Sequence, residues 1–322
     1  MLTVMLATRN RAPILEKVLQ AYCVLEAPAS GWKLVVVDNG STDGTARVID
    51  AFVSRLPLHR VFEPEPGKNR ALNAGLALAE GDLIVFTDDD VFPQPDWLAA
   101  MRRSADSQPS YAMFAGAILP RWESPPPHWV HWIDLRPVFT LTDPALVEGP
   151  VSAGLVFGPN MAIRTALFRT GLRFDTSIGP RGASYPMGSE TELVQRLARQ
   201  GQRAWYSPQA VVEHLVRKAQ LEQGWVMDRA VRYGRGKFRL AQTGTAPAGQ
   251  ASLALRWRAS RRLLKEGLVM TASRLARRQR ALLRARWRFN YWRGQLIEAR
   301  LFAAERREAG APPSGAEARP QA

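Results

Sequence analysis

The sequence of 322 residues contains a single cysteine, Cys23, and no long uninterrupted hydrophobic run. One cysteine can form neither an intrachain disulfide nor a cysteine-based zinc site, which excludes a disulfide-rich secreted protein. A membrane-spanning helix needs about 18 consecutive apolar residues, and no stretch approaches that length. The first residues, MLTVMLATRNR, lack the basic leader and the small-residue cleavage site of a signal peptide. We therefore expect a cytoplasmic protein.

Glycine-rich phosphate-binding motifs are also missing. Neither G-x-G-x-x-G nor G-x-x-x-x-G-K-[ST] occurs in the chain, which excludes an ordinary dinucleotide site and a P-loop. The composition, with 46% hydrophobic and 23% charged residues, is normal for a soluble globular protein of one large or two ordinary domains.

Basic residues are distributed unevenly along the chain. The net charge is +15, yet residues 1–250 contain 27 Lys+Arg against 24 Asp+Glu, whereas residues 251–310 contain 16 against 4. A nearly neutral body is therefore followed by a basic C-terminal segment. The tail from residue 310 is rich in Ala, Pro and Gly, and we expect it to be disordered.

Short apolar runs alternate with helical patterns over the first hundred residues. Strands are predicted at 2–7, 33–40, 59–65 and 82–86, with helices after Pro13 and over 46–55 and 67–81. This alternation predicts an α/β fold with an open, mostly parallel sheet flanked by helices. The polar segments TRNR (8–11), DNGSTD (38–43) and TDDD (87–90) follow three of these strands. Because ligands bind at the carboxyl ends of strands in such sheets, these segments are expected to share one crevice.

The pattern loosens beyond residue 96. We expect helices over 97–107 and 190–201 and strands over 111–119, 203–208 and 210–214, with residues 154–163 returning to the core. Residues 120–150 are rich in Pro and Trp, which favours a functional loop or lid.

Three consecutive aspartates, Asp88 to Asp90, follow the strand at 82–86. Their mutual repulsion requires a compensating cation. Mn²⁺ or Mg²⁺ is the natural candidate, because these ions prefer oxygen ligands and often share them with substrate phosphates. The alternative is a solvated acidic turn.

At this point the sequence resembles the family 2 glycosyltransferases, which have the GT-A nucleotide-sugar-binding fold. Eight segments carry the resemblance, in the family's order, over about residues 1–240: TRNR, VVVDNGSTDGT, GKNRALNAGLALAEGDLIVFTDDDVFPQPDWL, FGPNMAIR, FDTSIG, GSETELVQRL, YSPQAVVEH and RYGRG. Each is weak alone, but eight in order are specific. The resemblance implies a catalytic domain over 1–240, a basic helical extension over 250–308 and a disordered tail over 310–322.

The resemblance also implies a sugar-transfer reaction that inverts the anomeric configuration. An acceptor hydroxyl attacks the anomeric carbon of a nucleoside-diphosphate sugar, a divalent metal neutralises the leaving diphosphate, and a carboxylate removes the acceptor proton. The expected product is a cell-surface polysaccharide or glycoconjugate, and the expected acceptor is a sugar or a lipid-linked acceptor. A nucleotidyltransferase-like enzyme and a non-catalytic membrane or nucleic-acid binder remain alternatives.

Site residues follow from the motif matches. Asp90 and His214 match metal ligands, and Asp88 matches the acid near the ribose and diphosphate. Asp38 matches the acid that holds the base or ribose, its alternative being an Asx-turn. The other expected donor-binding residues are Thr8, Asn10, Arg11, Lys68, Arg70, Asp89 and Arg235. Arg235 lies where the family often has a mobile basic loop, and Asn160 and Met161 lie where it lines the sugar and acceptor cleft.

The base is expected in GSETEL. The usual family pattern is Gly-Glu-Asp-x-Glu/Asp-Leu, so Ser189 replaces a Glu and Glu190 takes the Asp position. Glu190 is the predicted catalytic base, because it keeps a carboxylate at the start of a helix, where the dipole favours its ionised form. Glu192 is a possible supporting acid, and the alternative for both is a capping role.

The basic segment reads as long amphipathic helices. Leucine or phenylalanine recurs every seven residues from Leu268 to Leu296, among arginines and the tryptophans Trp257, Trp287 and Trp292. Such helices suit the anionic inner face of the plasma membrane, with insertion expected for Trp287, Phe289 and Trp292. Packing on the catalytic domain, or self-association, is the alternative. Nucleic-acid binding rests on charge alone and is the least favoured reading.

Overall fold

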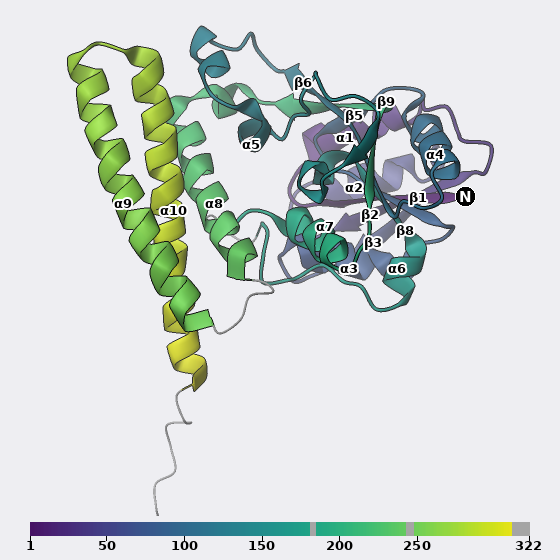
Figure 1. The fold of residues 1–322 in the computed structure, drawn as a ribbon. Helices are drawn as coiled ribbons and strands as arrows, with labels where there is room; N and C mark the ends of the chain where they lie inside the picture. Colours follow the sequence, from purple (N-terminus) through teal and green to yellow (C-terminus); the bar gives the residue numbers. More distant parts are fainter. Residues whose placement is uncertain (181–184, 243–247, 311–322) are drawn as a thin grey trace, which may run out of the picture. The chain divides into compact units, whose positions relative to one another are not determined.

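The computed structural model describes residues 1–180, 185–242 and 248–310 (Figure 1). The chain divides into a sheet unit, Met1–Val226, and a helical unit, Met227–Ala322. The predicted tail lies outside the described residues, apart from Gly310.

Among the described residues, the sheet unit contains a nine-stranded sheet in the order β3-β2-β1-β4-β8-β6-β9-β5, with β7 paired to β9. The strands are β1 Leu2–Thr8, β2 Trp32–Asp38, β3 Leu58–Phe62, β4 Leu83–Phe86, β5 Val91–Pro93, β6 Met113–Trp122, β7 Gly149–Val151, β8 Met161–Arg164 and β9 Ala204–Val216. The helices are α1 Ala12–Tyr22, α2 Thr45–Phe52, α3 Lys68–Gly75, α4 Trp97–Ser107, α5 Leu135–Phe139, α6 Thr165–Arg169 and α7 Ser189–Arg199.

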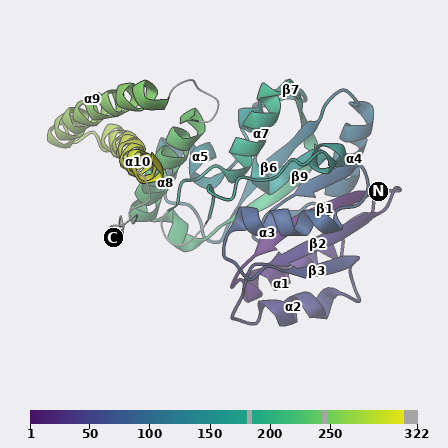
Figure 2. The ribbon, with the colours of Figure 1, turned by 90° about the horizontal axis from the view of Figure 1, so that it is seen from below.

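The first four strands form a parallel half-sheet, as the alternation predicts. The strands β1 and β2 are apolar almost throughout and are buried, which is typical of strands covered on both faces. Figure 2 shows α3 on one face of these strands and α1 and α2 on the other. Because β1 and β2 run in register, with Thr8 beside Asp38, the loops that follow them emerge at the same edge.

The other half of the sheet is mixed, so the parallel part of the predicted open sheet is its first half. Of the eight pairings in the described residues, four are antiparallel: β4 with β8, β6 with β8, β5 with β9, and β7 with β9. The chain reaches β8 through a long irregular connection, so no right-handed crossover helix forces the strand to run parallel to its neighbour. The two strands predicted over 203–214 form the single strand β9, with a register irregularity opposite Gly116 and Ala117.

The segment over 120–150, predicted as a loop or lid, contains several short regular elements. It contains the end of β6, a 3-10 helix at His128–Trp132, α5 and β7. Phe139 of α5 is buried, with its ring 5.7 Å from the ring of Trp122 and stacked 6.1 Å from that of Trp225. These contacts hold Phe139 in place, with its carbonyl oxygen beside His214 of β9.

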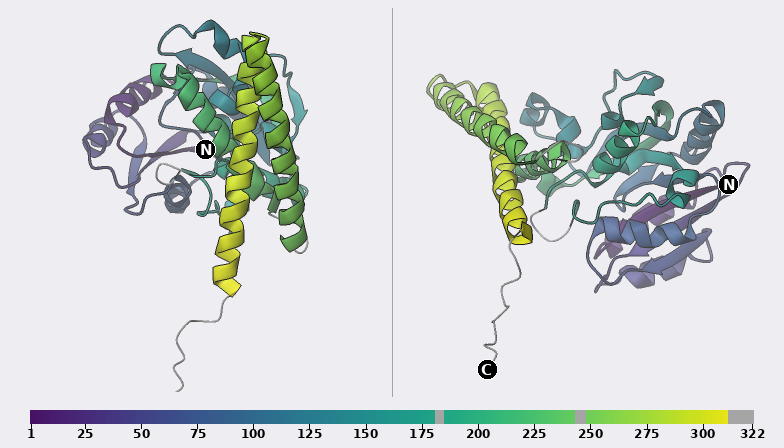
Figure 3. Two further views of the ribbon diagram at one scale, coloured as in Figure 1. Left: turned by 90° about the vertical axis from the view of Figure 1, so that its left-hand side faces the viewer. Right: turned by 60° about the horizontal axis from the view of Figure 1, so that its bottom comes forward.

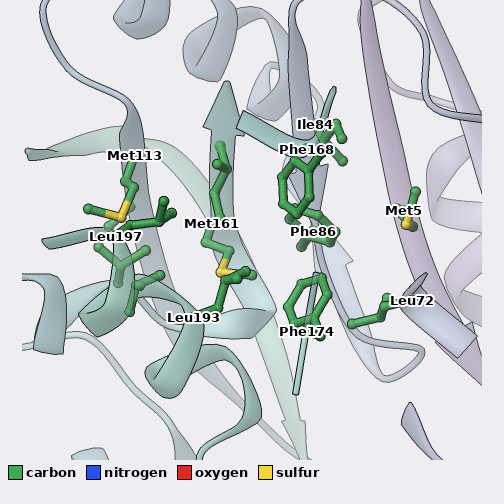
Figure 4. Close-up of a cluster of buried hydrophobic side chains, with 14 of the residues drawn as sticks. Met5, Leu72, Ile84, Phe86, Met113, Met161, Phe168, Phe174, Leu193 and Leu197 are labelled. Atoms are coloured by element: carbon green, nitrogen blue, oxygen red, sulfur yellow. The ribbon is translucent and has the colours of Figure 1, made fainter. Parts of the chain in front are cut away.

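The main hydrophobic cluster lies between the sheet and the helices α3 and α7 (Figure 4). Aromatic rings of Phe86, Phe168 and Phe174 pack at centroid distances of 5.2–6.3 Å. Leu72 of α3 and Leu193 of α7 contribute from the two helices. The cluster therefore fixes the starts of α3 and α7 relative to the end of β4.

The helical unit contains most of α8 (Gln223–Gln242), with α9 (Ala248–Leu275) and α10 (Gln279–Gly310). The predicted long helices are confirmed, and α9 and α10 lie side by side (Figure 3). The chain turns at Arg277, which has a φ of 52°, so the predicted seven-residue repeat is divided between two helices and forms no single stripe. None of the described helices has the length and apolar character needed to cross a bilayer.

Two glycines bring α8 and α10 close together. A Cβ at Gly234 would lie 2.0 Å from the carbonyl oxygen of Tyr291, and one at Gly294 would lie 2.0 Å from that of Val231. Both positions therefore exclude any side chain. The glycines of RYGRG lie in a helix, and the prediction of a mobile loop there is wrong.

Candidate active site

The loops after β1 and β2 are joined by hydrogen bonds at the sheet edge. The side chain of Asn10, a residue with a φ of 53°, accepts a hydrogen bond of 2.8 Å from the backbone amide of Thr42. The backbone amide of Asn10 donates to Ser41 Oγ at 3.0 Å. Asp38 is buried and accepts 3.0 Å from the amide of Ser41. This hydrogen bond to an amide three residues on gives Asp38 a local structural role in the loop, and a donor contact stays a prediction for Asp38 and Asn10.

Asp88, Asp90 and His214 form a cluster in which one ligand atom from each lies within 4.8 Å of the others. The two aspartates lie in the turn between β4 and β5, and His214 lies on β9. The pairing of Val91 with His214 across β5 and β9 brings together residues more than a hundred positions apart.

The orientation of the His214 ring is fixed by a hydrogen bond to the backbone carbonyl of Phe139. Its Nδ1 lies 2.7 Å from the carbonyl oxygen of Phe139, and because a carbonyl only accepts, Nδ1 carries the hydrogen. Nε2 then lies 3.4 Å from Asp90 Oδ1. Burial alone would lower the pKa of His214, but the Asp90 carboxylate outweighs this and raises it. Burial would raise the pKa of Asp90, and His214 holds it below its ordinary value.

This donor set fits a divalent ion. Two carboxylates and one imidazole suit Mn²⁺ well and Mg²⁺ adequately. The hydrogen bond from Nδ1 to a backbone carbonyl is the usual support of a metal-ligating histidine, because it turns Nε2 toward the ion. Asp88, Asp90 and His214 could therefore hold such an ion.

Asp89 is not one of the three residues of this cluster. Its Oδ2 accepts a hydrogen bond of 2.7 Å from Thr8 Oγ1. Burial, reinforced by the charge of Asp90, raises the pKa of Asp89 to about 7, against the opposing charge of Arg11. Thr8 and Asp89 thus join the ends of β1 and β4, and a direct donor contact stays a prediction for Thr8, Arg11 and Asp89.

Lys68, the first residue of α3, connects two acids. Its ammonium contacts Asp88 closely and lies 2.5 Å from Glu190 Oε1. Burial would lower the pKa of Lys68, but the two carboxylates more than offset this and raise it. The lysine therefore carries a fixed positive charge between the acid that follows β4 and the acid at the start of α7.

Glu190 lies in the first turn of α7, as predicted. Its Oε2 accepts a hydrogen bond of 2.8 Å from Ser189 Oγ. Burial would raise the pKa of Glu190, but Lys68 lowers it by more, so the carboxylate is ionised at neutral pH. A Cβ at Gly158 would lie 2.6 Å from Glu190 Cδ. The side chain is therefore held between a lysine, a serine and a glycine backbone.

Glu192 is separated from this group. It is buried, and its carboxylate accepts hydrogen bonds from Arg196 at 3.0 and 2.9 Å. Arg196 also donates to the carbonyl of Arg173 at 2.7 Å. This arrangement favours the structural alternative for Glu192 over a supporting role in catalysis.

Two predicted donor-binding arginines have other partners. Arg70 is exposed and pairs with Glu65 at 2.9 Å. Arg235 is buried in α8 and lies 2.7 Å from Glu298 of α10. The ion pair with Glu298, within the helical unit, corrects the expectation of a mobile Arg235 that could cover a diphosphate.

Asn160 and Met161 also differ from prediction, because both are fully buried. Asn160 accepts a hydrogen bond of 2.8 Å from Trp97 Nε1 and donates to the carbonyls of Ala117 and Ala210 at 2.9 and 2.7 Å. Met161 lies in the hydrophobic cluster (Figure 4). Neither side chain lines a cleft. Within the FGPN segment, Gly158 is the residue that touches Glu190, and sequence reasoning missed it.

Comparison with known proteins agrees with this architecture. A solved structure of the mannosyltransferase PcManGT from Pyrobaculum calidifontis, in complex with GDP-Man and Mn²⁺, is 24% identical and has a TM-score of 0.55. The comparison covers 97% of this chain and 76% of that one. This likeness confirms the predicted GT-A fold.

Two curated relatives are glycosyltransferases. The glucosyl-dolichyl phosphate glucuronosyltransferase of Haloferax volcanii is 24% identical over 64% of this chain and 66% of its own length. The validoxylamine A glucosyltransferase of Streptomyces hygroscopicus is 31% identical over 31% of this chain and 24% of its own. The chain thus matches less than two thirds of either relative. The sequence model of the family described as Glycosyl transferase family 2 matches residues 3–170, so the chain belongs to this family.

Proposed function

We propose that this protein transfers a sugar from a nucleoside-diphosphate sugar to an acceptor hydroxyl, with inversion and with the help of Mn²⁺ or Mg²⁺. The observation that carries the proposal is the linked group at the sheet edge, where Lys68 joins Asp88 to Glu190 and Asp88 lies with Asp90 and His214. This candidate cation site and the carboxylate of Glu190 lie near the carboxyl ends of the strands, where ligands bind in open α/β sheets, which supports the proposal.

The roles follow from the chemistry of each group. A divalent ion held by Asp90, His214 and Asp88 would stabilise negative charge on the departing diphosphate. Glu190 accepts the proton of the acceptor hydroxyl. The hydroxyl oxygen forms a bond to the anomeric carbon as the bond from that carbon to the diphosphate breaks. Attack opposite the leaving group inverts the anomeric configuration. Lys68 holds Glu190 ionised and orients it.

We further propose that the acceptor is a sugar or a lipid-linked acceptor, and that the enzyme works at the cytoplasmic face of a membrane in polysaccharide or glycoconjugate synthesis. One curated relative is named for a dolichyl phosphate substrate, which supports a lipid-linked acceptor. The basic helical segment, with 16 Lys+Arg against 4 Asp+Glu over residues 251–310, supports an anionic surface as its partner.

Donor hydrolysis tests the reaction without knowledge of the acceptor. UDP-, GDP- and dTDP-sugars are incubated with the full chain and Mn²⁺, and release of the nucleoside diphosphate is followed beside a Glu190→Gln control. We expect one nucleotide class to be hydrolysed slowly by the natural chain and much more slowly by the variant. Proton NMR of the sugar at early times, before its anomers interconvert, reports the anomeric configuration in which it is released. Absence of both hydrolysis and nucleotide binding for every donor would overturn the proposal.

A further inference from the structure

Helix α9 exposes four large apolar residues on one side, opposite three small or polar residues that are buried. Ala259, Glu266 and Ser273, spaced by seven, are at most 6% exposed. Four large apolar side chains are instead 64–80% exposed: Trp257, Leu264, Leu268 and Leu275. At about 100° per residue these four fall within roughly 40° of one another, opposite the buried three. A helix of a soluble protein has the reverse arrangement.

The inner face of α9 includes an ion pair with α10 and two small buried residues. Glu266 Oε2 accepts from Arg288 Nε of α10 at 3.0 Å. Ala259 and Ser273, one on each side of Glu266 along the helix, are small enough for α10 to approach closely. The contact with α10 therefore leaves the four large residues outside. We define these four residues, Trp257, Leu264, Leu268 and Leu275, as the outer face of α9.

Basic residues flank this outer face. Residues 254–278 contain eight Lys or Arg and a single acid, the buried Glu266. The guanidinium of Arg261 lies 4.6 Å from the centre of the Trp257 ring, and those of Arg258 and Arg262 lie 5.8 Å from the ring of Trp292. Long basic side chains beside an apolar strip can reach lipid phosphates while the strip enters the acyl region. Two copies of the same face would oppose like charges.

We propose that the outer face of α9 inserts at the interface of an anionic bilayer. The inference deepens, and rests on, the membrane location proposed above, but it does not depend on the sugar-transfer reaction. It also revises which residues enter the lipid. Trp287, Phe289 and Trp292 of α10 are half-buried, and the ring of Trp292 packs 5.2 Å from that of Tyr291. The four most exposed large apolar residues of the described helical unit lie on α9, whereas Leu301 of α10 is 44% exposed.

Vesicle co-sedimentation of the full chain tests the proposal. The probe is vesicles of phosphatidylcholine mixed with phosphatidylglycerol, compared with phosphatidylcholine alone. The variant Leu264→Glu/Leu268→Glu is expected to lower the partition coefficient by about tenfold or more, because it removes apolar insertion and adds negative charge. The matched control is Val24→Glu/Val147→Glu, which makes the same changes at two equally exposed apolar residues of the sheet unit and is expected to bind as the natural chain does.

A second readout follows the inserted residue. Quenching of tryptophan fluorescence by brominated lipid should fall in Trp257→Phe, while Trp287→Phe leaves it unchanged. This milder pair keeps the proposal testable if the glutamate variant fails to fold. A natural chain that ignores anionic vesicles at low salt would overturn the proposal. Unchanged binding by the glutamate variant together with unchanged quenching by Trp257→Phe would do so as well.

Self-association is an outcome that the same variants detect. A dimer that Leu264→Glu/Leu268→Glu dissociates, with no vesicle binding by either form, would show that a second copy covers the face and would overturn the proposal. Donor hydrolysis is measured on every sample. Vesicle binding without donor hydrolysis supports membrane insertion of the outer face and counts against the sugar-transfer reaction. Donor hydrolysis without vesicle binding supports the reaction and counts against membrane insertion.

Discussion

The sheet unit and the helical unit each bury charged pairs, and the two kinds of pair differ in what surrounds them. Lys68, Asp88 and Glu190 keep 15–22% of their side-chain surface exposed, and one end of the network leads to the Asp90–His214 cluster. Glu298 of the helical unit is fully buried and accepts from Arg235 at 2.7 Å and from Arg239 at 2.5 Å. A partly open pair can exchange partners with a ligand, whereas a closed one holds helices together.

Metal removal should have the largest effect if the partly exposed group of Lys68, Asp88 and Glu190, with the Asp90–His214 cluster, serves catalysis. EDTA is expected to abolish sugar transfer, and Mn²⁺ or Mg²⁺ to restore it, because the diphosphate charge is otherwise uncompensated. Isothermal titration of Mn²⁺ gives an independent readout, and Asp90→Asn should weaken that binding. Full transfer activity in chelator would remove Asp90 and His214 from the proposed metal site.

Loss of the base should come next. Glu190→Gln preserves size and hydrogen bonding but cannot accept a proton, so turnover should fall by ~10²–10⁴-fold with donor affinity nearly unchanged. Steady-state kinetics and donor titration check this. The matched control is Glu192→Gln two residues away, whose carboxylate already pairs with Arg196. If the control loses turnover and Glu190→Gln does not, the assignment of the base is wrong.

The closed pair should affect stability and leave chemistry unchanged. Glu298→Gln leaves Arg235 and Arg239 facing a neutral group, and breaking a buried pair costs about 3–5 kcal/mol. Chemical denaturation should show this loss for the helical unit, with turnover per folded molecule unaltered. Glu305→Gln is the control, because Glu305 is exposed and its pair with Arg239 contributes at most about 1 kcal/mol. Equal losses in both variants would contradict the distinction between closed and exposed pairs.

A smaller effect is expected at Gly158, which acts through Glu190 as a positioning residue. A methyl group there would lie 2.6 Å from Glu190 Cδ. Gly158→Ala should therefore displace the carboxylate and lower kcat by about tenfold, with KM for the donor little changed. Gly154→Ala is the control, since its nearest neighbour would be Ser152 Oγ at 3.9 Å. A change in KM without a change in kcat would argue against positioning.

The smallest effect concerns pH. Because the folded-state pKa of Glu190 is lowered, its pair with Lys68 adds stability that is complete above the ordinary glutamate pKa and is lost as pH falls through the folded value. The stability difference between the natural chain and Glu190→Gln should thus be constant from neutral pH to about pH 5 and shrink at more acidic pH. Thermal unfolding at a series of pH values measures it. A difference that grows on acidification would reverse the assigned sign.

Local pattern predicted the elements well where one short segment contains its own signal. The apolar runs before TRNR, DNGSTD and TDDD are strands, and the acids of GSETEL open a helix. Pattern failed where a residue's role depends on a distant partner. Asn160 belongs to a recognisable motif, yet its hydrogen bonds to Trp97, Ala117 and Ala210 come from three other elements. The pairing of Arg235 with Glu298 depends in the same way on α10 packing against α8.

The sequence by itself determined the family, the parallel half of the sheet and the positions of Asp88, Asp90 and Glu190, because these depend on residue order and on local hydrophobic periodicity. Only the tertiary structure decided which side chains meet. The β5–β9 pairing places His214 beside Asp90, and Lys68 lies between Asp88 and Glu190. The packing of α9 on α10 leaves the four residues of the outer face exposed. These outcomes rest on contacts between residues far apart in the chain, and such contacts leave no periodic trace in the sequence.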